Sequence, residues 1–195
     1  MGQQLALLAV GFVLTTVLGG LLGYVFQQRA WTHQFTVQRR TTEREAAFRA
    51  LDELSTLLDK RRYRMLRTYW LLDEAPDDQF EDALVAYRGV LEEWNDGLNR
   101  RLALVATHFG VDMKRELEAL YEKYRAAGQL LEREIRGRRS GETTRDREAL
   151  ATLLEELNVH NYSFAENGLA AIIAGRVGSD LAPDQRRATS TLPAA

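Results

Sequence analysis

The stretch Phe80-Glu-Asp-Ala-Leu84-Val-Ala-Tyr87-Arg-Gly-Val-Leu91-Glu-Glu-Trp94 places a large apolar residue at every third or fourth position. That spacing matches the 3.6-residue turn of an α-helix and puts the apolar side chains on one face. The register continues through Leu98, Leu102, Val105 and Phe109. Gly110 then offers a C-terminal stop, and Asp112 offers an N-cap for a following helix. The stretch therefore predicts a long amphipathic helix ending near residue 109.

Three further segments show the same helical periodicity. Four long helices with short connections favour an all-α protein, in which an up-down-up-down four-helix bundle occupies residues 29–177. Residues 178–195 are rich in Pro, Ser, Thr and small residues, so we expect a disordered tail there. Capping and turn residues set the other boundaries. One helix extends from the capping box Thr42-Glu-Arg-Glu45, or from further upstream, to Pro76. Another extends from Met113 to Gly137-Arg-Arg-Ser-Gly141, and the last extends from Thr143 or Thr144 to about Arg176.

Charge supports folding the first two of these helices back on one another. Residues 29–70 carry ten basic and five acidic groups, whereas residues 73–99 carry one basic and nine acidic groups. The basic run Lys60-Arg-Arg-Tyr-Arg64 would then lie opposite acidic residues such as Glu92 and Glu93. We therefore interpret the run as a solvated face paired with the second helix, in preference to a phosphate or lipid-headgroup site.

The first 28 residues carry no charged side chain, and residues 5–26 form a mainly apolar run. As a helix this run would be about 33 Å long, enough to span a hydrocarbon core of about 30 Å. A cleaved signal peptide is disfavoured, because no Lys or Arg precedes the run and no Ala-x-Ala-like site follows it. Residues 1–28 are therefore predicted to be a retained single-pass transmembrane anchor.

Flanking charge predicts the orientation of this anchor. Arg29, Arg39, Arg40 and Arg44 follow it, and no charged side chain precedes it. The positive-inside rule then places the N-terminus outside and the C-terminal domain in the cytoplasm. Arginine outnumbers lysine 23 to 3, which is typical of a GC-rich bacterial genome. We expect a protein of the bacterial inner membrane that contacts the lipid bilayer through this anchor.

Small residues recur at every fourth position of the predicted anchor. Gly11, Thr15, Gly19 and Gly23, here called the anchor stripe, share one face of a helix. Small residues let two helix backbones approach closely in lipid, where burying leucine against leucine gains little. The anchor stripe therefore predicts association of the anchor with a second copy or with another membrane protein.

The sequence contains no assembled candidate for catalysis, for a cofactor or for a metal. It has no cysteine, which excludes thiolate nucleophiles and Cys-ligated zinc. Glu156 and His160 occur once, at i and i+4, and not as the paired Glu-x-x-His motifs of a di-iron bundle. Phosphate-loop, dinucleotide-binding and nucleophile-elbow motifs do not occur. The net charge of −2 argues against a nucleic-acid partner. We expect a protein that is not an enzyme.

Polar residues gather near the midpoints of two of the predicted helices. We call this group the polar layer, and Asn161 should be buried within it because it falls on an apolar stripe and would then need hydrogen-bond partners. Such a layer could fix helix register, as a buried Asn does in coiled coils, or it could line a pocket for a small polar ligand. The register interpretation is favoured. The members of the polar layer are Trp94, Asn95, Asn99, Asn158, His160 and Asn161.

These patterns predict a membrane-anchored helical bundle that acts as an interaction or scaffold module and oligomerises through the anchor stripe. The alternative is a membrane-tethered, sensor-like bundle that binds a small polar ligand at the polar layer. The first interpretation depends on the glycine spacing and on the missing catalytic motifs, and the second depends on Asn161 and its neighbours.

Overall fold

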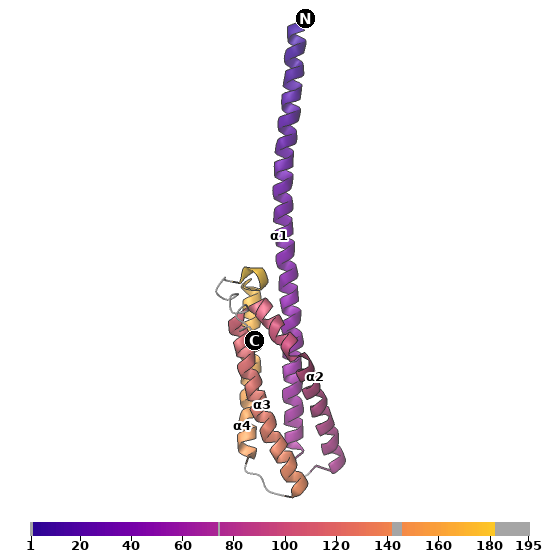
Figure 1. Ribbon diagram of the computed structural model, residues 1–195, viewed down its shortest axis with the longest axis vertical. Coiled ribbons are helices and arrows are strands. Elements are labelled where there is room, and N and C mark those ends of the chain that lie inside the picture. The colour runs from indigo at the N-terminus through magenta and orange to yellow at the C-terminus, as the bar shows by residue number, and fades with distance from the viewer. Residues whose placement is uncertain (1, 74, 142–145, 182–195) are drawn as a thin grey trace, which may run out of the picture. The chain divides into compact units, whose positions relative to one another are not determined.

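The computed structural model describes the backbone of residues 2–73, 75–141 and 146–181, with side chains for the same ranges except residues 2–15, 18, 22, 25, 30 and 32. Within these ranges the protein is all-helical and has no strand, which confirms the predicted all-α class. The helices, shown in Figure 1, are α1 (Gly2–Trp70), α2 (Asp77–Phe109), α3 (Val111–Ser140), α4 (Arg147–Ile173) and the short 3-10 helix η1 (Gly178–Asp180).

The chain divides into two compact units, residues 1–42 and residues 43–195. The first unit consists of the N-terminal part of α1. Near its end, the hydroxyls of Thr41 and Thr42 donate to the carbonyls of Val37 and Gln38 at 3.1 and 3.0 Å, which is the bonding of residues inside a helix. The predicted capping box at residues 42–45 therefore does not begin a helix. The helix begins further upstream, which was the other predicted start. Residues 24–75 contain no Gly or Pro that would interrupt α1.

The predicted transmembrane anchor gains no support from the structure. Among the described residues, no helix contains a stretch that is long and apolar enough to cross a membrane. Beyond the backbone, many of residues 5–26 lie outside the described set, including Gly11 and Thr15. Gly19 and Gly23 are exposed, and a Cβ added to either would meet nothing within 4 Å. The anchor and its association therefore stay predictions.

The second unit is a helical bundle in which successive helices run in opposite directions (Figure 1). Each helix buries an apolar stripe, and the stripe read from residues 80–109 packs largely as its register requires. Phe80, Leu84, Tyr87 and Trp94 are each at most 2% exposed. The buried core includes Leu54, Leu58 and Met65 from α1, Leu117, Leu120, Tyr124 and Leu131 from α3, and Leu150, Leu154, Leu157 and Phe164 from α4.

The connections differ from the predicted boundaries in several places, and α1 ends at Trp70 instead of near Pro76. Gly110 alone joins α2 to α3 with φ of 87°, a left-handed value that favours glycine. Asp112 is consequently in the first turn of α3 instead of capping it, where its carboxylate complements the helix dipole. Gly137 is buried inside α3, which ends at a left-handed Gly141. The last helix begins at Arg147, and the predicted starts at Thr143 and Thr144 lie outside the described residues.

The first residues of the predicted tail pack against the bundle. Leu181 is buried, and the backbone N–H of Ser179 donates to the Glu43 carboxylate at 2.9 Å. The expectation of disorder from residue 178 onward is therefore wrong for residues 178–181, because Leu181 adds apolar surface to the core and the Glu43 carboxylate pairs with Ser179. For residues 182–195, which lie outside the described set, it stays a prediction.

Candidate functional site

The structure divides the predicted polar layer between the core and the surface. Trp94 on α2 and Asn161 on α4 are buried, and both contact Tyr124 of α3. The other four members, Asn95, Asn99, Asn158 and His160, are exposed. Their positions fall beside the apolar stripes of α2 and α4, so the helical period turns them towards solvent. The His160 ring accordingly bonds within its own helix, to the Glu156 carbonyl at 2.7 Å.

On the α4 side of Tyr124, the buried polar groups have partners. The Tyr124 hydroxyl donates to the Leu58 carbonyl at 2.8 Å and accepts from Asn161 Nδ2 at 3.0 Å. Asn161 Nδ2 also lies 3.0 Å from Asp59 Oδ1. Burial raises the pKa of the Tyr124 phenol, so the hydroxyl stays a neutral donor. These hydrogen bonds join α1, α3 and α4 at one level of the bundle.

On the α2 side of Tyr124, two nitrogens of a buried arginine lack such partners. Arg61 of α1 is only 2% exposed, and within the described part of the chain its Nε and Nη1 have no hydrogen-bond partner. Its guanidinium carbon lies 4.7 Å from the ring centroid of Tyr124 and 5.1 Å from that of Trp94. Guanidinium groups stack favourably on aromatic faces, but such stacking replaces none of the lost hydrogen bonds.

The burial of Arg61 corrects the interpretation of the basic run as a solvated face. Of that run, Lys60 does pair with the second helix, with Nζ 2.7 Å from the Glu93 carboxylate. Arg61 instead occupies the apolar register of α1, three residues after Leu58 and four before Met65. Both of those residues are fully buried. This register is the signal in the sequence that could have located Arg61 in the core.

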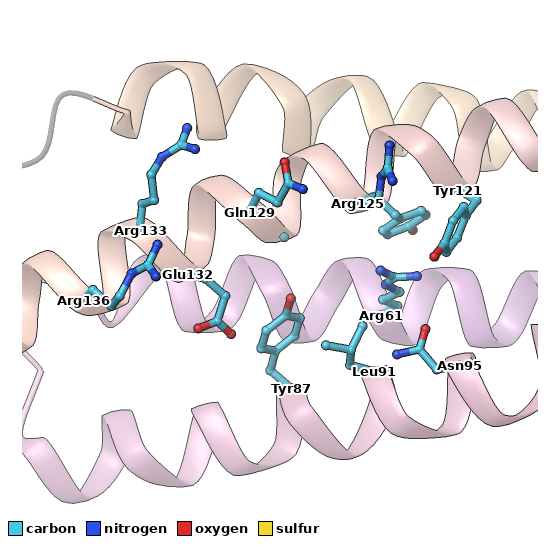
Figure 2. A pocket seen from close by; sticks show the side chains of 12 residues that line it. Arg61, Tyr87, Leu91, Asn95, Tyr121, Arg125, Gln129, Glu132, Arg133 and Arg136 are labelled. Atoms are coloured by element: carbon cyan, nitrogen blue, oxygen red, sulfur yellow. The ribbon is translucent and has the colours of Figure 1, made fainter.

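Arg61 forms part of the wall of a cavity of about 400 Å³, here called the α2–α3 cavity. Figure 2 shows its lining, with Tyr87, Leu91 and Asn95 projecting from α2 towards α3, and with Arg61 coming from α1. Gly128 of α3 keeps the space open, since a Cβ there would lie 3.3 Å from the Tyr87 hydroxyl. The remaining lining residues come from α3: Tyr121, Tyr124, Arg125, Gln129, Glu132, Arg133 and Arg136.

The charges around this cavity are mostly positive. Four arginines and one glutamate line it. Two of the arginines are already in ion pairs, Arg125 with Glu122 and Arg133 with Asp146, each at 2.5 Å. Burial lowers the pKa of the Arg61 guanidinium, which nevertheless stays charged at neutral pH because guanidinium groups are strongly basic. The α2–α3 cavity therefore presents a buried positive charge to whatever occupies it.

Aromatic rings make up much of the remaining wall. Trp94 stacks on Tyr121 with ring centroids 6.3 Å apart and an angle of 11° between the planes. Tyr87, Tyr121 and Tyr124 line the cavity together with Leu91. Burial raises the pKa of the Tyr87 phenol, although the nearby positive charge of Arg61 opposes the shift. The wall thus combines one buried cation with flat apolar surfaces and neutral hydroxyls.

Within the ranges that the structure describes, no group of three or more His, Asp or Glu side chains could hold a metal ion. The chemistry that the α2–α3 cavity can perform is therefore argued from its arginine and its aromatic rings. A helical bundle by itself does not determine function, because the same architecture serves many unrelated activities. Comparison of the chain with protein-family models, with curated proteins and with solved structures finds no match.

Proposed function

We propose that this chain is a membrane-tethered helical bundle that binds a small polar ligand in the α2–α3 cavity. The observation that carries the proposal is Arg61, a buried cation in the wall of a cavity, whose Nε and Nη1 have no hydrogen-bond partner in the described part of the chain. Its volume of about 400 Å³ falls in the range of small-molecule sites. This is the sensor-like alternative of the sequence interpretation, centred on Arg61, with Asn95 as the one exposed asparagine of the polar layer that lines the cavity.

The cost of burying an unpaired cation supports this proposal. Removing an ion from water costs several kcal/mol, and a buried guanidinium ordinarily recovers that cost through hydrogen bonds to a carboxylate or to carbonyl oxygens. Cation–π stacking returns only about 0.5–2 kcal/mol. A ligand that supplied acceptors to Arg61 would provide the missing interactions and would stabilise the folded bundle by mass action.

Thermal denaturation of the full-length protein in detergent tests ligand binding. We expect some member of a library of small polar molecules to raise the melting temperature, by about 5–10 °C at a hundredfold excess over its Kd. Gly128→Leu, which fills the α2–α3 cavity, should abolish that shift. Gly89→Leu is the matched control, because Gly89 is an exposed helical glycine with open space around it. Shifts that survive Gly128→Leu would place binding elsewhere and contradict the proposal.

We propose further that residues 1–28 anchor the protein in the bacterial inner membrane, with the N-terminus outside and the bundle in the cytoplasm. The support is the sequence: no charged side chain precedes Arg29, and residues 29–44 contain four arginines. Membranes washed with carbonate should retain the protein. Reporter fusions to its C-terminus should be active only with a cytoplasmic reporter, and activity of a periplasmic reporter would reverse the proposed orientation.

An interaction or scaffold role through the anchor stripe is the second candidate function. It is favoured by the open space around Gly19 and Gly23, which would let a partner helix approach closely. In a membrane association assay, Gly19→Ile and Gly23→Ile should each weaken self-association. Gly20→Ile is the matched control, because Gly20 is equally exposed but lies off the stripe. Equal effects of all three substitutions, or a monomer throughout, would contradict an association through this face.

A further inference from the structure

The donor set of the α2–α3 cavity narrows the chemistry of its ligand. Arg61 is a planar fork of N–H donors, and it accepts no hydrogen bond. Its Nε and Nη1 have no acceptor among the described residues, and both are covered, so a ligand would reach them only after a small rotation of the guanidinium. A carboxylate or phosphate can receive two parallel hydrogen bonds from Nη2 together with either Nε or Nη1. The ligand should therefore present an anionic oxygen pair to Arg61.

The charge of the site favours a single negative charge. Arg61 supplies one buried positive charge, and the flanking Arg125 and Arg133 are already neutralised by Glu122 and Asp146. Arg136 is exposed to water, and Glu132 adds a negative charge to the same wall. A phosphate dianion at Arg61 would keep about one uncompensated charge beside the buried aromatic rings, which is costly. A carboxylate would be matched one to one.

The rest of the wall indicates the body of the ligand. Leu91 and the rings of Tyr87, Tyr121 and Tyr124 line the cavity. Aromatic and aliphatic surfaces gain most from contact with another apolar or planar group, through area burial and ring stacking. A compact dicarboxylate would instead bring its second charge against these rings.

We propose that the ligand of the α2–α3 cavity is a small monocarboxylate with a planar or aliphatic body, whose carboxylate pairs with Arg61. This inference rests on the proposed ligand-binding function. In the bound state the carboxylate accepts hydrogen bonds from the guanidinium, and the body packs between Leu91 and the tyrosine rings. The carboxylate thereby gives the buried cation a directly bonded counter-charge, in addition to the negative charge of Glu132 on the same wall.

Calorimetric titration of the full-length protein in detergent tests this proposal, with sodium benzoate as the probe. Benzamide is its uncharged counterpart, and inorganic phosphate is the alternative anion. We expect benzoate to bind and to raise the melting temperature, and benzamide and phosphate to bind about tenfold more weakly or not at all, because a charge-assisted hydrogen bond is lost or a charge is left unmatched. Acetate and phenylacetate extend the series to smaller and longer bodies.

Two variants connect the effect to Arg61. Arg61→Met should abolish benzoate binding, and Arg61→Lys should weaken it about tenfold, because lysine keeps the charge but loses the planar fork. Arg67→Met is the matched control, since Arg67 is exposed on the same helix. Circular dichroism of each variant establishes that the bundle is folded. Benzoate binding that survives Arg61→Met, or equal affinity for benzoate and benzamide, would overturn the proposal.

The result separates this inference from the proposed function. If library compounds bind in a Gly128-dependent manner while no carboxylate does, the carboxylate inference is wrong and the ligand-binding function stands. Arg61-dependent binding of phosphate in preference to benzoate would likewise overturn only the carboxylate inference. If neither the library nor the carboxylate series shifts the melting temperature, both proposals are wrong.

Discussion

Tyr124 separates two regions at one level of the bundle, and they treat buried polar groups in opposite ways. Towards α4, the Tyr124 hydroxyl and the Asn161 amide are joined to Leu58 and Asp59 by hydrogen bonds. Towards α2, Nε and Nη1 of Arg61 and the indole N–H of Trp94 are buried without hydrogen-bond partners in the described residues. A buried polar group without a hydrogen bond lowers the stability of the fold. The first region therefore stabilises the bundle, and the second region destabilises it.

Truncating Trp94 should have the largest effect on stability. Its ring is fully buried and packs against Arg61 in the region towards α2, which we call the unpaired region. We expect Trp94→Ala to lower the free energy of unfolding by about 4 kcal/mol, from lost burial and from the void that remains. Trp70→Ala, at an exposed tryptophan on α1, should change it by less than about 0.5 kcal/mol. Urea denaturation followed by circular dichroism measures both, and a small effect at Trp94 would mean that the region is loosely packed.

Tyr124→Phe tests the region towards α4, which we call the paired region because its buried polar groups are hydrogen-bonded. It removes the hydroxyl that contacts both Leu58 and Asn161, so we expect a loss of about 2 kcal/mol. Combined with Asn161→Leu, the two losses should be less than additive, because both substitutions remove the same hydrogen bond. Tyr162→Phe, at an exposed tyrosine of α4, is the control. Full additivity would break the assignment of these residues to one network.

Arg61→Met should have the opposite sign, and it is the sharpest test of the difference between the regions. Replacing an unpaired buried cation with an apolar side chain of similar length should stabilise the ligand-free bundle by about 1 kcal/mol. Arg67→Met should be close to neutral, because Arg67 is exposed. A clear loss of stability on Arg61→Met would show that its stacking on Trp94 and Tyr124 outweighs its desolvation. Arg61 would then be structural.

The sequence could predict the paired region better than the unpaired one. Asn161 falls on the apolar stripe of its helix, so its burial and its need for partners follow from position alone. Arg61 falls on an equally clear stripe between Leu58 and Met65, but grouping it with its charged neighbours concealed that register. The rings that hold it come from α2 and α3, 33 and 63 residues further along the chain. No local pattern brings them together.

Helix ends and the cavity show the same division between local and non-local information. Gly110 and Gly141 stop helices through their own backbone conformation, and both are visible as glycines at the ends of periodic segments. The capping box at residues 42–45 failed as a start because capping requires the chain to leave the helix before it, and no residue there makes it do so. The α2–α3 cavity depends on a missing side chain at Gly128 and on the separation of two helices, which composition does not encode.

Alkaline titration probes the tyrosines that border both regions. Burial raises the pKa of Tyr124 and of Tyr87 above the ordinary value of 10, whereas in the unfolded chain both phenols ionise near pH 10. Stability should therefore be unchanged below pH 10 and should fall as the pH rises above it, because only the unfolded state readily releases these protons. Tyr124→Phe should make this decline shallower, and Tyr162→Phe should not. An unchanged slope for Tyr124→Phe would contradict the burial of its hydroxyl.

The smallest expected effect comes from the surface pair beside the unpaired region. Lys60 Nζ lies 2.7 Å from the Glu93 carboxylate, and each side chain is nearly half exposed. A double-mutant cycle of Lys60→Met and Glu93→Gln should give a coupling of about 0.5 kcal/mol, which weakens further in high salt. Glu93 lies one residue before Trp94, yet its carboxylate accepts a hydrogen bond from Lys60 at the surface. A much larger coupling would mean that this carboxylate also compensates the buried guanidinium, and the contrast between the two regions would then disappear.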